Sequence, residues 1–311
     1  GDAEPGREDE EGGETNSPFM CTPQSFPPTP GARSFVMARS TQFAEDVLFL
    51  ARDQLRVEQY SSSLNSKTRA VAAALRSQSR LAVWNASDTG AGIALTCGQH
   101  CAQKTGNTLY CSTRAMVPVL RNCPIYFEVA VESASGLKGD MASLSIGLST
   151  QEMPLNTLVG SWKGSVGLCT TGQILDAGRW TSTANMSLAA FGHGRVVGVL
   201  IYVDDGTAFT TWDGEMVNAT VSFSVDGQPV TSLAGGTDLT LSIPKEEELY
   251  PTVTLHDAST KVMCRFCRED MQVLTRDGIG AQEGEAVFAL DGSVLFEDDE
   301  GMSESEASSR G

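Results

Sequence analysis

Apolar and polar side chains alternate through the middle of the chain, which is the pattern of half-buried β-strands. The first clear alternation begins at Ile125. One side of this segment carries Tyr126, Glu128, Ala130 and Glu132, and the other carries Phe127, Val129 and Val131. The same period of two returns at Leu144, Ile146 and Leu148. Glycines and an aspartate in residues 133–140 predict a turn between these two strands.

Four further segments of this kind follow, at residues 164–175, 194–206, 220–230 and 249–266. Asp226 and Gly227 predict a tight hairpin turn. Upstream, residues 81–84, 93–101 and 108–119 predict earlier strands interrupted by glycine and asparagine. Downstream, residues 286–296 predict one more short hairpin, with Asp291 and Gly292 at its turn. The pattern therefore predicts an all-β domain.

Five of these segments, taken in order, resemble the SPRY domain family. They are Tyr-Phe-Glu-Val at 126–129, Ile-Gly-Leu-Ser at 146–149, Val-Val-Gly at 196–198, the Phe-x-x-Asp-Gly hairpin at 223–227 and Leu-Tyr-Pro-Thr-Val at 249–253. The resemblance covers residues 81–268. It implies a bent antiparallel β-sandwich of the lectin-like jelly-roll type.

Composition divides the chain into four regions. Residues 1–39 are acidic and then rich in Pro, Ser and Thr, which predicts a disordered tail. Residues 40–80 are expected to form a helical extension, residues 81–268 the sandwich, and residues 269–311 a short hairpin followed by a disordered acidic tail. In the first tail, Ser17, Thr22 and Thr29 each precede a proline and are candidate phosphorylation sites, although a plain solvated tail is the simpler interpretation.

The helical extension is predicted from apolar residues spaced three and four apart. They are Phe43, Val47, Leu50, Ala51 and Leu55. Ser40 or Thr41 can cap this helix, and a second, alanine-rich helix is expected at residues 67–76. The helices at 41–76 either brace the sandwich or dock a partner, and the brace is favoured because an exposed apolar stripe is a liability.

The net charge of −17 is concentrated at the two ends. Residues 1–34 contain seven acidic and two basic side chains, and residues 268–311 contain twelve and three, so these ends carry −5 and −9. An acidic chain repels phosphate groups, so neither nucleic acid nor an anionic membrane is an expected partner. With no secretory signal and no long apolar segment, the chain is expected to be soluble and cytoplasmic or nuclear.

The eight cysteines favour reduced thiols over a metal site. Cys264 and Cys267 have the CxxC spacing, but strand residues three apart point to opposite faces. Cys97 and Cys101, beside His100, have no second pair at zinc-finger spacing. No metal or cofactor is therefore expected.

No pattern of a catalytic site was found in the sequence. There is no GxSxG, Walker or HExxH motif. The chain has three histidines, and His193, the candidate base for Cys169, lies between two glycines as turn residues do. We therefore expect that the protein is not an enzyme.

The connection at residues 150–162 is unusually apolar for a loop and is the main candidate site. It either folds back on the core or presents a contact surface, and the resemblance implies that it lies near the partner-binding face. Trp162 individually favours a core position. Residues 204–220 are longer than the usual link in the family and, with a second Asp-Gly turn, predict an extra or extended hairpin that would either cover or enlarge that face. The candidate partner-binding residues are Arg114, Met153, Pro154, Leu155, Asn156, Trp162, Trp212 and Asp213.

The expected function is that of a non-enzymatic interaction module. A sandwich holds its loops in a fixed arrangement, so a peptide or protein partner can bind without a large ordering cost. The resemblance implies loop-mediated binding and an adaptor or substrate-receptor role. Two alternatives remain: a lectin-like sandwich that binds a glycan at Trp212, Asp213 and Asn218, or a structural subunit of a larger assembly.

Overall fold

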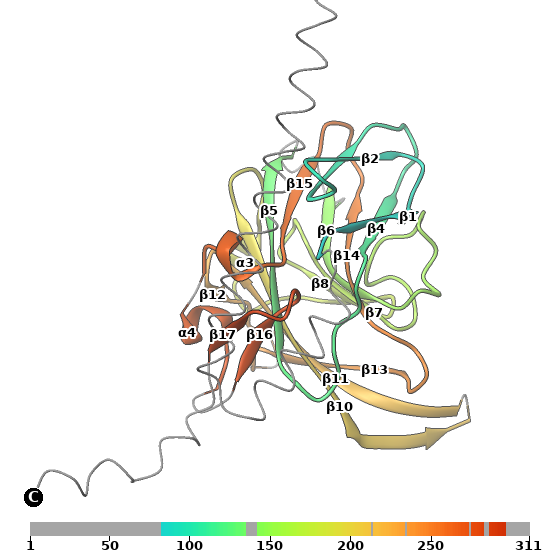
Figure 1. The fold of residues 1–311 in the computed structure, drawn as a ribbon, viewed down its shortest axis with the longest axis vertical. Helices are drawn as coiled ribbons and strands as arrows, with labels where there is room; N and C mark the ends of the chain where they lie inside the picture. Colours follow the sequence, from blue (N-terminus) through green and yellow to red (C-terminus); the bar gives the residue numbers. More distant parts are fainter. Residues whose placement is uncertain are drawn as a thin grey trace, which may run out of the picture. The chain divides into compact units, whose positions relative to one another are not determined.

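The computed structural model describes residues 82–134, 142–212, 214–233, 235–273, 275–282 and 286–296. In these residues the fold is all-β, with two sheets and very few helical residues (Figure 1). The predicted helices at 41–76, the phosphorylation candidates and both acidic tails lie outside the described residues. None of the described helices has the length and apolar character needed to span a membrane.

Sheet A has seven antiparallel strands in the order β1-β4-β14-β6-β7-β8-β9. Their bounds are β1 Trp84–Thr89, β4 Cys111–Ala115, β14 Tyr250–Leu255, β6 Leu144–Ser149, β7 Ser165–Cys169, β8 Ile174–Asp176 and β9 Arg179–Thr181.

Sheet B follows the order β12-β11-β10-β5-β15-β3-β2, with β13 paired to β11 and β16 paired to β5. Its strands are β12 Gln228–Pro229, β11 Gly214–Val225, β10 Val196–Thr211, β5 Ile125–Ser133, β15 Lys261–Arg265, β3 Cys101–Lys104, β2 Ile93–Thr96, β13 Asp238–Pro244, β16 Val287–Ala289 and β17 Val294–Phe296. The short helices are α3 Met186–Ala189, η1 Arg268–Asp270 and α4 Arg276–Ile279. All pairings are antiparallel except the short parallel contact of β16 with β5.

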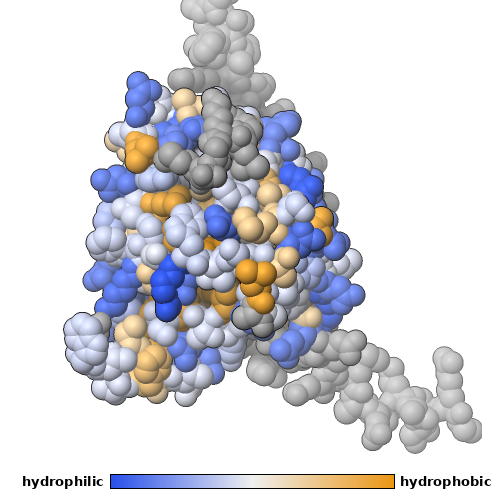
Figure 2. All heavy atoms as spheres, turned by 180° about the vertical axis from the view of Figure 1, so that it is seen from behind, coloured by the Kyte–Doolittle hydropathy of each residue, from blue (hydrophilic) through white to orange (hydrophobic). Residues whose placement is uncertain are grey.

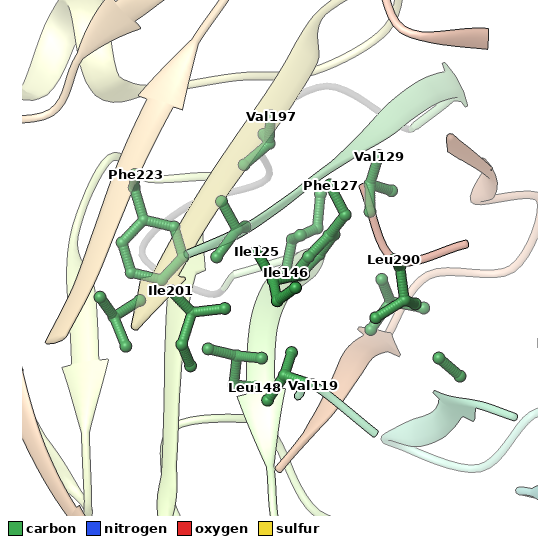
Figure 3. Packing of buried hydrophobic residues seen from close by; sticks show 14 of the residues in the cluster. Val119, Ile125, Phe127, Val129, Ile146, Leu148, Val197, Ile201, Phe223 and Leu290 are labelled. Carbon is green, nitrogen blue, oxygen red and sulfur yellow. The ribbon is translucent and has the colours of Figure 1, made fainter. Parts of the chain in front are cut away.

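The main core lies between the two sheets. Phe127 and Val129 of β5 enter it from sheet B, and Ile146 and Leu148 of β6 enter it from sheet A (Figure 3). Leu290, which directly follows β16, joins the same cluster. The apolar–polar alternation in the sequence is explained by this arrangement, because every second residue of β5 faces this core.

The long hairpin expected at residues 204–220 is present. β10 and β11 remain paired from Val197 with Val225 to Thr211 with Gly214, with a bulge between Asp204 and Phe209. Its tip projects beyond the sheets (Figure 1). The structure adds β13, which pairs along β11 and lies between the predicted strands at 220–230 and 249–266.

The outer face of sheet B is covered by the segment that follows β15. Met271, Ile279 and Leu295 pack with Tyr126 in a second apolar cluster. The hairpin predicted at 286–296 forms as β16 and β17 and adds to this layer. On the face drawn in Figure 2, the remaining apolar side chains lie in small groups between polar ones, as is usual on protein surfaces.

Candidate functional site

The candidate site is built on the outer face of sheet A. The strands of this sheet alternate large apolar residues toward the core with small residues on the other side. These small residues include Ser145 and Gly147 of β6, Gly167 of β7 and Thr254 of β14. All four are buried, although they face away from the core. Another part of the chain therefore covers them.

That cover is the connection between β6 and β7, residues 150–164, which lies across the sheet. The Val159 amide donates to Thr254 Oγ1 at 2.8 Å, and the Gly160 amide donates to Ser165 Oγ at 3.0 Å. The Val159 carbonyl accepts from Ser145 Oγ at 3.2 Å. A Cβ at Gly167 would approach the Val159 oxygen to 2.9 Å, so only a glycine lets the loop lie this close. The small residues on this face of the sheet thus allow the apolar loop to pack directly against it.

Arg114 of β4 fastens the start of this loop. Its guanidinium donates to Ser149 Oγ at 3.0 Å, to Asp88 Oδ1 at 2.8 Å and to the Met153 carbonyl. Arg114 and Met153 are each 1 % exposed. Both were expected at the binding surface, and the structure corrects this, because they lie under the loop and fix its position.

The middle of the loop is held by β4 as well. The Ser112 amide donates to the Leu155 carbonyl at 2.7 Å, and Ser112 Oγ donates to the Thr157 carbonyl at 2.8 Å. These bonds turn the side chains of Pro154 and Asn156 outward, where both are exposed. Leu155 is half-buried.

A groove of about 320 Å³ runs beside the loop. It is lined by Tyr110, Asn156, Thr157, Leu158, Ser161, Leu175, Gly178 and Trp180. None of these residues carries a charge. The Tyr110 hydroxyl stays protonated, because burial, together with the nearby Cys169, raises its pKa. The groove therefore presents aromatic rings, an amide and hydroxyl groups.

The opposite wall of the groove is the turn between β8 and β9. Ala177 and Gly178 both have positive φ, 44° and 83°, as a two-residue hairpin turn requires. The Gly178 amide donates to the Gly160 carbonyl at 2.8 Å, which ties this turn to the loop. The turn places Trp180 at the groove with 53 % of its surface exposed.

The sequence-predicted residues separate into three sets. Of the candidates, Asn156 lines the groove, with Pro154 and Leu155 next to it in the loop, while Arg114 and Met153 lie beneath. Trp162, for which a core position was favoured, is 40 % exposed and does not line the groove. Trp212 is 93 % exposed at the tip of the β10–β11 hairpin, and Asp213 lies outside the described residues.

Sequence reasoning missed Tyr110 and Trp180. Tyr110 lies in the predicted strand at 108–119 and Trp180 in a short segment with no predicted strand, and neither is near residues 150–162 in the chain. The signal that could have been followed is the pairing of a tight Ala-Gly turn with a tryptophan two residues later, since an aromatic residue beside a turn is seldom required for the turn itself.

The structure separates the residues proposed for a glycan site. Asn218 pairs with Asp204, whereas Trp212 follows the last rung, where Thr211 pairs with Gly214. The four residue steps from Gly214 to Asn218 span roughly 13 Å along the strand. The side-chain amide of Asn218 also accepts from Ser242 at 3.0 Å. Trp212 and Asn218 therefore do not form one platform, and Asp213 lies outside the described residues.

No catalytic pairing is seen among the candidates weighed from the sequence. The Cys169 thiol donates to Ser145 Oγ at 3.5 Å, and burial raises its pKa to about 11. His193 Nδ1 lies 2.6 Å from the Glu132 carbonyl instead. Among the described residues, no group of three or more His, Cys, Asp and Glu side chains is arranged to hold a metal ion.

A buried carboxylate on the other sheet has a structural role that the sequence did not indicate. Glu128 of β5 accepts from the Gln272 and Val273 amides at 2.8 and 2.7 Å and from the Tyr126 hydroxyl at 3.2 Å. Burial raises its pKa, although these hydrogen bonds act in the opposite direction. Glu128 thereby fixes the start of the segment that covers sheet B.

The comparison with family models gives a family for this all-β part of the chain. Residues 124–269 match the family model of the SPRY domain, so this part of the chain is a SPRY domain. The match includes the loop at 150–164 and Trp180, whereas Tyr110 precedes it. A solved structure described as "Crystal structure of human SPRY domain" is 21 % identical with a TM-score of 0.39, covering 56 % of this chain and 94 % of that one. No curated protein matches the chain.

Proposed function

We propose that the protein binds a peptide segment of a protein partner in the groove between the 150–164 loop, Tyr110 and Trp180. SPRY domains are in general interaction modules without catalytic activity. The observation that carries the proposal is that hydrogen bonds hold the backbone of the 150–164 loop and of the β8–β9 turn, on the two sides of the groove, before any partner arrives. Proteins gain affinity from such preorganised sites because little chain entropy is lost on binding.

The groove chemistry indicates the kind of segment that it would take. Its volume of about 320 Å³ accommodates one or two side chains, and its lining is uncharged. A charged side chain would lose water there without finding an opposite charge. An apolar side chain could pack between the rings of Tyr110 and Trp180, with Asn156 available to hydrogen-bond the peptide backbone.

Trp180 is the proposed main contact. Tryptophan is among the residues that contribute most often to binding hot spots, and a half-exposed ring has surface left to bury. Tyr110 is already supported from behind, because its ring lies 5.2 Å from the ring of His256. The two rings thus differ in role, with Tyr110 a fixed wall and Trp180 a partly free one.

The proposal includes a role as an adaptor or substrate receptor. One surface would hold the peptide while other parts of the chain contact further components. The hairpin tip with Trp212 offers a second, separate surface, and a binding experiment must distinguish it from the groove.

The test is a displayed library of random peptides panned against the full chain. Peptides that bind the wild type are then measured against Trp180→Ala and, as a matched control, Trp212→Ala. We expect Trp180→Ala to weaken binding by about 2 kcal/mol, or roughly 30-fold, and Trp212→Ala to leave it unchanged within about twofold. Equal binding to wild type and Trp180→Ala would contradict the proposal.

A further inference from the structure

Two cysteines meet at the turn between β2 and β3. Cys97 directly follows β2, and Cys101 begins β3 opposite Thr96. Cys97, Gly98 and Gln99 have successive positive φ values of 53°, 62° and 71°. The His100 amide closes the turn on the Cys97 carbonyl at 3.1 Å. Because Thr96 pairs with Cys101, this tight turn places Cys97 and Cys101 at the same end of one hairpin, where their side chains interact.

The turn is held in place by its neighbours. The Trp84 amide donates to the Gln99 carbonyl at 3.1 Å, and the Cys264 amide donates to the His100 carbonyl at 2.9 Å. Trp84 and Cys264 both belong to the main core. These backbone hydrogen bonds therefore hold the turn that carries the two thiols in one position.

The two thiols differ in access. Cys97 is the one exposed cysteine in the part of the chain that the structure describes, whereas Cys101 is 1 % exposed. Burial raises the pKa of Cys101 to about 12, and contact with Cys97 adds to this rise. Cys101 is therefore a protonated thiol near neutral pH. It would react after Cys97.

A positive charge lies close to the pair. The ammonium of Lys261 forms an ion pair with Glu132 at 2.7 Å, and it also interacts with both Cys97 and Cys101. A neighbouring ammonium favours a thiolate over a thiol, and the thiolate is the species that attacks a disulfide. Lys261 thus lies where its charge would favour the thiolate of Cys101, which attacks in the second step of an exchange.

We propose that Cys97 and Cys101 form a reversible disulfide by exchange with a small-molecule disulfide. The Cys97 thiolate attacks one sulfur of the small disulfide, which forms a mixed disulfide and releases one small thiolate. The Cys101 thiolate then attacks Cys97 Sγ, which forms the Cys97–Cys101 bond and releases the second small thiolate. Both released thiolates take up the protons that the two cysteines lost. The protein dithiol is oxidised and the small disulfide is reduced to two thiols.

The experiment uses the full chain in mixtures of reduced and oxidised glutathione. After equilibration, free thiols are alkylated and the protein is digested with trypsin. Residues 81–104 form one tryptic peptide that contains both cysteines and no others. We expect this peptide to lose two hydrogens and to take up no alkyl group under oxidising mixtures, and to recover both thiols after reduction with a dithiol.

Two variants separate the steps. In Cys101→Ser, the first step remains and the second is lost, so one glutathione should stay on Cys97. In Cys97→Ser, the peptide should carry neither glutathione nor an internal disulfide, because Cys101 is buried. Cys97 is exposed, so this variant should melt at the wild-type temperature. The proposal would be overturned if the wild type accumulated glutathione on Cys97 as Cys101→Ser does, or if Cys97 paired with a cysteine outside residues 81–104.

Discussion

Removal of the Arg114 guanidinium should destabilise the domain far more than removal of an exposed arginine. Arg114→Met keeps most of the apolar stem but takes away the donors to Asp88, Ser149 and the Met153 carbonyl. Breaking a buried pair by removal of one partner costs about 3–5 kcal/mol. Because the Asp88 side chain keeps 24 % exposure, we expect the lower end, about 3 kcal/mol.

Urea unfolding of the full chain measures this loss, with tryptophan fluorescence as the signal, since Trp84 is fully buried. With a slope of about 3 kcal/mol per molar urea, the midpoint should fall by about 1 M. The matched control is Arg179→Met, whose side chain is 81 % exposed and pairs with Asp176 at 3.5 Å. That variant should change stability by about 0.5 kcal/mol or less. Equal losses of stability for the two variants, or a loss below about 1 kcal/mol for Arg114→Met, would refute the role of Arg114 in holding the 150–164 loop.

Two further predictions concern the sheets. Gly147→Ala should lower the free energy of unfolding by about 4 kcal/mol or more, because a Cβ there would lie 2.0 Å from the Val166 carbonyl oxygen. The control Gly192→Ala should leave stability unchanged in the same thermal or urea unfolding, because nothing lies within 4 Å of a Cβ at that position. Unaltered stability of Gly147→Ala would show that β6 and β7 are not paired this closely. Burial raises the pKa of Glu128 above its ordinary value of 4.5, so this residue contributes most to stability below pH 4.5 and less as the pH rises through the raised pKa. In a series of melting curves, the stability of the wild type relative to Glu128→Gln should therefore fall with rising pH. The opposite trend would mean that the pKa of Glu128 is lowered.

The sheets were predictable because each strand of the middle region obeys a simple rule. Val129 and Ile146 alternate with small or polar residues, and Asp226 with Gly227 forms the expected turn, with φ of 49° and 74°. The long β10–β11 hairpin was also predictable from its second Asp-Gly pair. The strand β13 was missed although Leu239, Leu241 and Ile243 alternate with polar residues in the same period of two.

The groove was predictable only in part. The apolar content of residues 150–162 indicated an unusual loop, and the structure shows that part of it packs inward, since Leu158 is buried while Asn156 is exposed. Arg114 was expected at the surface from the resemblance to the SPRY family, and the sequence does not show which polar face of a sheet is covered. Serine, threonine and glycine in place of charged residues on that face were the available sign, because a solvated face usually carries charges. Trp180 could not be placed, because its position depends on the β8–β9 turn.

The central claim is that the groove beside Trp180 binds the partner segment, and the indole N–H signals of the four tryptophans test it most directly. A peptide selected on the full chain is titrated into the labelled protein, and each signal is assigned from a single Trp→Phe variant. The account predicts a large shift for Trp180, with Trp84 and Trp212 unchanged. A shift of Trp212 with Trp180 unmoved would contradict it.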